Sequence, residues 1–147
     1  MPHVLAPKPV LAVAPIFFNV DASVGNQGAN SNAGDILLVQ FLLKLTGKLA
    51  VRPDARAKML ATPQTGKIDA TTIENIRFFQ QSLKEAGRPV TVDGRMSSAK
   101  GYFFSGTPYT IVHLNAIVRT GFLKQWPRLQ DIPECPPTLR PILASIL

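Results

Sequence analysis

The sequence predicts a single, mainly α-helical domain, and three stretches with helical spacing support this prediction. In each stretch, apolar residues recur every three or four positions, which places them on one face of an α-helix. The stretches cover residues 35–47, 72–87 and 107–121. With 147 residues, of which 46% are hydrophobic, the chain is long and apolar enough to build one packed core.

The first predicted helix is apolar on most of its surface and is therefore expected at the centre of the core. Asn32, three residues before Asp35, is suited to cap its first turn, and Gly47 is suited to end it. Gln40 interrupts the apolar surface, so a buried Gln40 must find hydrogen-bond partners, most simply in the backbone of a nearby turn.

The other helices follow from similar signals. Pro53 can start a short helix that continues to Leu60. Thr71 and Glu74 have the spacing of a capping box for the next helix, whose end is predicted at Gly87. That helix has an apolar face which includes Phe79, and we expect Phe79 to be buried. Thr107-Pro108 is expected to start a further helix, and the apolar C-terminal residues predict one more.

Two glycine turns flank the helix at 72–87. In each turn a glycine precedes an apolar residue by two positions, Gly66 before Ile68 and Asp93-Gly94 before Met96. The helices before the two turns also share a local pattern, because Gln40 and Gln80 each precede a leucine by three residues. This weak internal repeat predicts that the glycines reverse the chain while the glutamines bond to the turn backbone.

These residues resemble the peptidoglycan-binding-like domain, a small three-helix module attached to many bacterial wall hydrolases. The matching segments are Val39–Leu43, Thr65–Thr72, Ile76–Gln80 and Val92–Met96. The chain departs from the family pattern with Thr65 in place of an aspartate, Asp69 and Ser97 in place of glycines, and Lys100 in place of a threonine. The resemblance implies an orthogonal three-helix core over residues 35–100, with an extended arm and loop at 1–34 and a helical extension at 101–147. It assigns Gln40, Gly66, Ile68, Phe79, Gln80, Asp93 and Gly94 a structural role.

We expect no enzyme activity, because no nucleophile–base pair and no metal-binding or glycosidase motif is recognisable. The single cysteine, Cys135, stands among prolines, and His113 is a lone histidine, so both are read as structural. Trp126 is expected to pack rather than to bind sugars. No cofactor or metal is expected.

Two functions remain. The net charge of +7 and the resemblance favour a non-catalytic module that binds peptidoglycan or muropeptides. The basic residues proposed for contact with carboxylates are Arg77, Lys84, Arg88 and Arg95, although an ordinary solvated face would look the same. The alternative is a structural or adaptor protein of a phage tail or of a contractile or type VI secretion machine. Its protein partner would bind through the N-terminal arm or the C-terminal helix.

Nucleic-acid binding is disfavoured because few aromatic residues are interleaved with the basic ones. The prolines at positions 2, 7, 9 and 15 interrupt the apolar N-terminus, so no clear signal peptide and no membrane span are expected. Cleavage after Ala12-Val13-Ala14 is the minority alternative. We therefore expect synthesis in the cytoplasm, with delivery to the periplasm or envelope by a specialised route.

Overall fold

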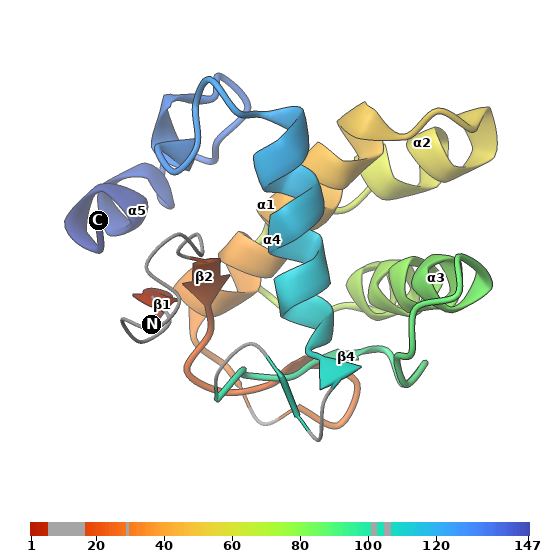
Figure 1. Cartoon of the computed structure of the whole chain (residues 1–147). Coiled ribbons are helices and arrows are strands. Elements are labelled where there is room, and N and C mark those ends of the chain that lie inside the picture. Colours follow the sequence, from red (N-terminus) through yellow and green to blue (C-terminus); the bar gives the residue numbers. More distant parts are fainter. Residues whose placement is uncertain (6–16, 29, 101–102, 105–106) are drawn as a thin grey trace.

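The computed structural model of the chain describes residues 1–5, 17–28, 30–100, 103–104 and 107–147. It is mainly α-helical, as predicted (Figure 1). Its helices are α1 (Ala33–Leu49), α2 (Pro53–Leu60), α3 (Ala70–Glu85), α4 (Thr110–Gly121) and α5 (Arg140–Ser145), with a 3-10 turn at Leu129–Asp131.

Helix α1 is the centre of the core. Its residues from Gly34 to Leu43 are all buried, so this helix has no solvated face along that length. Helix α4 crosses it and packs against it through Ile111, Leu114 and Val118, none of which is exposed (Figure 1). Because α4 contributes to the same apolar core, the packing of the α3 region depends on residues well beyond position 100.

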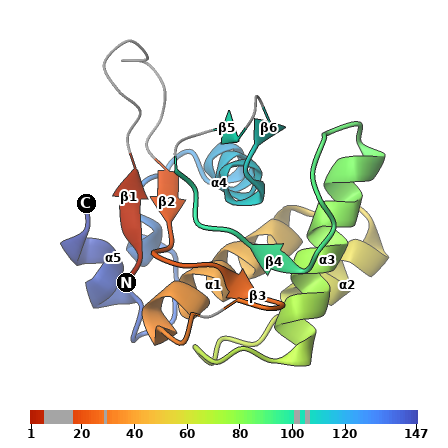
Figure 2. The ribbon, with the colours of Figure 1, turned by 90° about the horizontal axis from the view of Figure 1, so that it is seen from below.

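Within the described residues, three short antiparallel ribbons accompany the helices (Figure 2). β1 (His3–Leu5) pairs with β2 (Phe17–Asn19), so that Val4 lies opposite Phe18. β3 (Val24–Gly25) pairs with β4 (Arg95–Met96), and β5 (Phe103–Phe104) pairs with β6 (Thr107–Pro108). The second ribbon ties the N-terminal part of the chain to the glycine turn at Asp93-Gly94.

Two buried asparagines hold β2 in the core. Asn115 of α4 accepts the N–H of Phe18 at 2.7 Å and donates to the carbonyl of Phe18 at 2.9 Å. Asn19 accepts the N–H of Ala99 at 3.0 Å and donates to its carbonyl at 2.8 Å. These side chains satisfy backbone groups that would otherwise be buried without partners. Of the predicted N-terminal arm, residues 6–16 lie outside the described part of the chain.

Several predicted helix boundaries are confirmed. The side chain of Asn32 accepts the N–H of Asp35 at 2.9 Å and caps α1, and α2 begins at Pro53 and ends at Leu60. After α3, the N–H groups of Gly87 and Arg88 bond back to the carbonyls of Lys84 and Leu83 at 3.0 and 2.9 Å. Gly87 has φ of 84°, the left-handed conformation expected of a glycine after a helix end.

The predicted end of the first helix at Gly47 is wrong, because α1 continues to Leu49. A Cβ atom at Gly47 would lie 2.8 Å from the backbone nitrogen of Leu60 and 2.9 Å from the Cβ of Met59. The glycine is therefore needed where α2 approaches α1 closely, and it does not cap the helix.

Two predicted helix starts are also wrong. Asp69, rather than Thr71, caps α3, because its carboxylate accepts the N–H of Thr72 at 2.6 Å. Aspartate and threonine are both good caps, and the chain folds with the earlier one at the boundary. Thr107-Pro108 forms strand β6, and α4 begins three residues later at Thr110.

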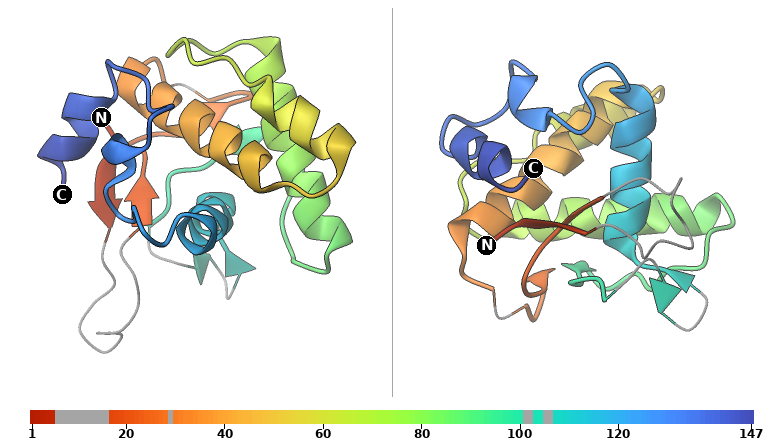
Figure 3. Two further views of the ribbon diagram at one scale, coloured as in Figure 1. Left: turned by 90° about the horizontal axis from the view of Figure 1, so that it is seen from above. Right: turned by 60° about the vertical axis from the view of Figure 1, so that its left-hand side comes forward.

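The C-terminal part of the chain covers one end of the core. Leu129, Leu139 and Leu143 are buried, and the ring of Trp126 meets Phe18 edge-on with 5.3 Å between centroids. The expectation that Trp126 packs is therefore confirmed. Figure 3 shows α5 beside β1, with both termini on this side of the molecule. In the described part of the chain, no helix is both long and apolar enough to cross a membrane.

Candidate functional site

The first glycine turn is bonded to Gln40, which is not exposed at all. Its Oε1 accepts the N–H groups of Thr65 and Gly66 at 3.0 and 2.9 Å. Its Nε2 donates to the carbonyl of Lys67 and to the hydroxyl of Thr72, both at 3.1 Å. One amide side chain therefore joins α1 to the turn and to the start of α3.

The second glycine turn is bonded to Gln80 in the same manner. Its Oε1 accepts the N–H groups of Asp93 and Gly94 at 3.1 and 2.9 Å. Its Nε2 donates to the carbonyl of Arg95 at 3.0 Å and to the hydroxyl of Thr110 at 3.4 Å. The prediction that both glutamines are buried with backbone partners is confirmed.

The two turns correspond residue by residue, including one apparent departure from the pattern. The hydroxyl of Thr65 accepts the N–H of Lys67 at 3.2 Å, and the carboxylate of Asp93 accepts the N–H of Arg95 at 2.9 Å. The hydroxyl of Thr65 therefore accepts the hydrogen bond that an aspartate carboxylate accepts in the second turn. Gly66 and Gly94 have φ values of 72° and 73°, which a residue with a side chain rarely adopts.

The sequence pattern missed Thr110 as the counterpart of Thr72. Thr72 follows its glycine by six positions, whereas Thr110 follows Gly94 by sixteen. Counting six positions from Gly94 leads to Lys100, which is exposed. The repeat therefore spans α1, α3 and α4. An insertion before α4 changes the spacing between the second glycine and its threonine, so the sequence pattern does not indicate Thr110. Of the two apolar residues that follow the turn glycines by two positions, Met96 is buried and Ile68 is half-buried against the core.

Most of these motif residues are buried and stabilise the fold rather than face solvent. The nearest surface hollow lies directly beside the second turn and has a volume of about 290 Å³. Most of its lining residues carry a polar group in the side chain, among them Asp93, Arg95, Ser97 and Tyr109. Hydroxyl, carboxylate and guanidinium groups next to an aromatic ring suit a polar ligand that has an apolar face, such as a sugar.

Arg95, which lines this hollow, has unused hydrogen-bonding capacity. Its nearest carboxylate oxygen, on Asp93, lies 3.8 Å away, which is a loose ion pair. Its Nε is buried and has no hydrogen-bond partner among the described residues. An unpaired buried donor is unfavourable, so an acceptor supplied by a ligand would stabilise this side chain.

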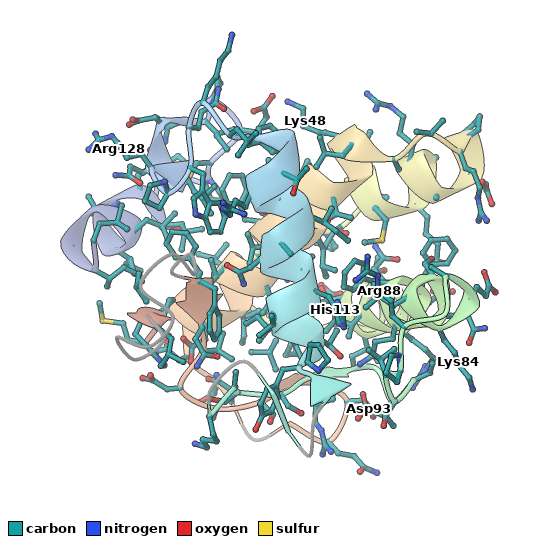
Figure 4. The ribbon with its side chains drawn as sticks, in the orientation of Figure 1. Lys48, Lys84, Arg88, Asp93, His113 and Arg128 are labelled. Atoms are coloured by element: carbon teal, nitrogen blue, oxygen red, sulfur yellow. The ribbon has the colours of Figure 1, made fainter. Side chains whose placement is uncertain are left out.

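The structure separates the four basic residues predicted for binding. Arg77 lies by the second turn, because a Cβ at Gly94 would sit 3.0 Å from one of its guanidinium nitrogens. Arg95 is in that turn and lines the hollow. Arg88 lines a different groove, and Lys84 is exposed on the last turn of α3 (Figure 4).

The groove that Arg88 lines is mostly apolar. It lies among α2, α3, α4 and the end of α1, and has a volume of about 400 Å³. An adjoining hollow of about 380 Å³ shares Leu49, Leu83, Arg88 and Ile117 with it and adds His113. Figure 4 shows Arg88 and His113 close together where α3 and α4 meet. Burial of the His113 ring, and secondarily the charge of Arg88, lower the pKa of this histidine.

Cys135 and His113, whose side chains could take part in chemistry, are both buried. Cys135 is buried, and burial raises the pKa of its thiol to about 11, which opposes formation of the thiolate. The Nε2 of His113 is buried without a hydrogen-bond partner in the described part of the chain. Among the described residues, no group of three or more His, Cys, Asp or Glu side chains could hold a metal ion.

Comparison with known proteins finds no matching family model, no matching curated protein and no matching solved structure.

Proposed function

We propose that this protein binds bacterial peptidoglycan without cutting it, and that the hollow beside the second turn is the contact surface. The observation that carries the proposal is Arg95, a cation with an unpaired buried Nε at a polar hollow that also contains Tyr109. Muropeptides offer carboxylates for the guanidinium and sugar rings for the aromatic face. Arg77, which lies against Gly94, adds a second cation close to the same turn.

Two further features support the proposal. The segments that resemble the peptidoglycan-binding-like domain form the two glutamine-bonded turns, and in the first turn Thr65 accepts the hydrogen bond that Asp93 accepts in the second. The net charge of +7 favours an anionic polymer over a neutral one. A shallow, charge-assisted contact of this kind is weak and should loosen as salt screens it.

The test is co-sedimentation of the purified protein with sacculi. We expect retention at about 20 mM salt, release at about 500 mM salt, and no soluble muropeptides at either concentration. The Arg95→Gln variant should lose most of its retention. Lys67→Gln is the matched control, because Lys67 occupies the same position in the first turn and its carbonyl is bonded by Gln40 as that of Arg95 is by Gln80.

Two outcomes would contradict the proposal. Protein that stays in the supernatant at low salt would exclude wall binding under conditions that favour it. Equal losses for Arg95→Gln and Lys67→Gln would show that overall charge, rather than the hollow, retains the protein. The alternative function, an adaptor that contacts other proteins in a phage tail or secretion machine, is favoured by a different observation: the apolar groove and its exposed rim.

A further inference from the structure

The groove among α2, α3 and α4 is built from helix faces that point toward each other. On α2 the lining residues are Ala55 and Met59, which have the spacing of one helical face, and Arg52 lies just before the helix. On α3 they include Phe78 and Ser82, four residues apart, and Ala86 follows at the end of the helix after the same interval. The end of α1 contributes Leu49, and Val51 at the rim has 94% of its surface exposed.

Bonds at one end of the groove fix its geometry. Asn75 of α3 donates to the carbonyl of Lys58 at 3.0 Å and to the hydroxyl of Thr62 at 2.9 Å, so α3 is attached to the end of α2. Lys58 also pairs with Glu74 at 3.0 Å and lies 5.5 Å from the centre of the Phe78 ring. The groove is therefore an open, preformed apolar surface between helices, which suits a helical segment better than an enclosed small ligand.

The charges around this groove are unbalanced. Asp54 is held by Arg52 at 3.1 Å and Glu74 by Lys58 at 3.0 Å. Glu85 accepts a hydrogen bond from Gln81 at 3.2 Å. Arg88, by contrast, is exposed, lines both parts of the groove, and its guanidinium has no hydrogen bond or ion pair among the described residues. The occupant that complements this surface is apolar on one side and carries a carboxylate.

We propose that this groove binds an acidic, amphipathic helical segment of a partner protein, with a carboxylate of the segment paired to Arg88. Apolar side chains at intervals of three and four would contact Leu49, Val51 and Phe78. A second copy of this chain fits less well, because a net charge of +7 opposes self-association. The inference gives the adaptor alternative a specific surface, and it does not depend on peptidoglycan binding.

The test uses two synthetic, fluorescein-labelled helical peptides of about 14 residues, a length of some four turns. Both carry leucine at every third or fourth position, and their remaining positions are mostly glutamate in one and mostly lysine in the other. Fluorescence anisotropy should show that the glutamate peptide binds at least about tenfold more tightly than the lysine peptide. Amide chemical shifts should change at the groove residues and not at the hollow that contains Arg95.

Matched variants make the test specific. Arg88→Glu should weaken binding of the glutamate peptide by about tenfold or more, whereas Lys84→Glu, at an exposed position of α3 that does not line the groove, should have less than about a twofold effect. Val51→Asp should weaken binding, whereas Leu123→Asp, at an exposed leucine that does not line the groove, should not. Arg88, Lys84, Val51 and Leu123 are all exposed, so these variants should keep the melting temperature of the parent.

Several results would overturn the proposal. These are equal affinity for the two peptides, equal losses for Arg88→Glu and Lys84→Glu, or shift changes outside the groove. A dimer in sedimentation equilibrium that Val51→Asp dissolves would assign the groove to a second copy of the chain. Binding of dodecanoate with no binding of the glutamate peptide would assign it to a lipid. None of these assays contains peptidoglycan, so their failure is distinguishable from failure of the wall-binding proposal.

Discussion

Replacing Gln40 by methionine tests whether the glutamine-bonded turn holds the fold together. Methionine preserves the length and most of the volume of the side chain but removes its amide. The substitution deprives the N–H groups of Thr65 and Gly66 of their acceptor. It also removes the donor to the carbonyl of Lys67 and to the hydroxyl of Thr72.

The expected loss follows from how buried these groups are. Gly66 is buried, so its N–H would remain without a partner, at a cost of about 1–3 kcal/mol. Thr65 is exposed, and water can replace part of its lost bond, so its N–H adds less. Together with the two lost donor bonds, the free energy of unfolding should fall by about 2–5 kcal/mol.

Urea denaturation followed by circular dichroism measures this change. With a slope typical of small proteins, the midpoint should move down by about 1–3 M urea. Gln80→Met should have a comparable effect, because Gln80 makes the equivalent bonds to Asp93, Gly94 and Arg95. Gln81→Met is the control, since Gln81 is exposed and should change stability by no more than about 0.5 kcal/mol.

A loss below about 1 kcal/mol for both Gln40→Met and Gln80→Met would show that the glutamine-bonded turns do not hold the fold together, because each buried amide would then contribute no more than one exposed hydrogen bond. A large loss for Gln81→Met as well would point to a general intolerance of methionine on these helices.

Two further predictions concern the core. Phe79→Ala should lower the free energy of unfolding by about 3–5 kcal/mol, because Phe79 is 4% exposed, and a variant that melts like the parent would contradict this packing. The pKa of His113 is lowered in the folded chain, so its contribution to stability is complete above the free-histidine pKa of about 6.5 and is lost as the pH falls below it. The melting temperature should therefore decrease as the pH is lowered from about 7.5 to about 5.5. His113→Gln should make the melting temperature less dependent on pH in this range, and an unchanged dependence would contradict the role given to His113.

The parts of the fold that follow from local pattern could be predicted from the sequence. Helical spacing located the faces of α1, α3 and α4, and the repeated glutamine and glycine predicted both bonded turns. These signals are readable because each depends on residues fewer than about 30 positions apart, at spacings set by helix and turn geometry.

Several of the misses arise from contacts between distant segments. Gly47 has the signature of a helix end, but the close approach of α2 explains it. Thr110 takes the role expected at Lys100 because an insertion separates it from its turn. The two candidate surfaces were also invisible, since the apolar groove joins residues from Thr46 to Ile117 and the hollow joins Gln80 to Thr110.

Both proposed functions depend on the short connection between α3 and the second turn, residues 88–95. Its first residue, Arg88, faces the apolar groove, and its last, Arg95, faces the polar hollow. The connection is fixed at one end by the backbone bonds that follow α3 and at the other by Gln80. A rigid scaffold that positions a loop in this way is a common arrangement for binding sites.

Gln40 and Gln80 should therefore differ in function although they match in structure. Gln80→Met releases the backbone of Arg95 and should reduce retention on sacculi, whereas Gln40→Met, at a similar cost in stability, should leave retention unchanged. If both variants are retained equally, the wall contact does not depend on how the second turn is held.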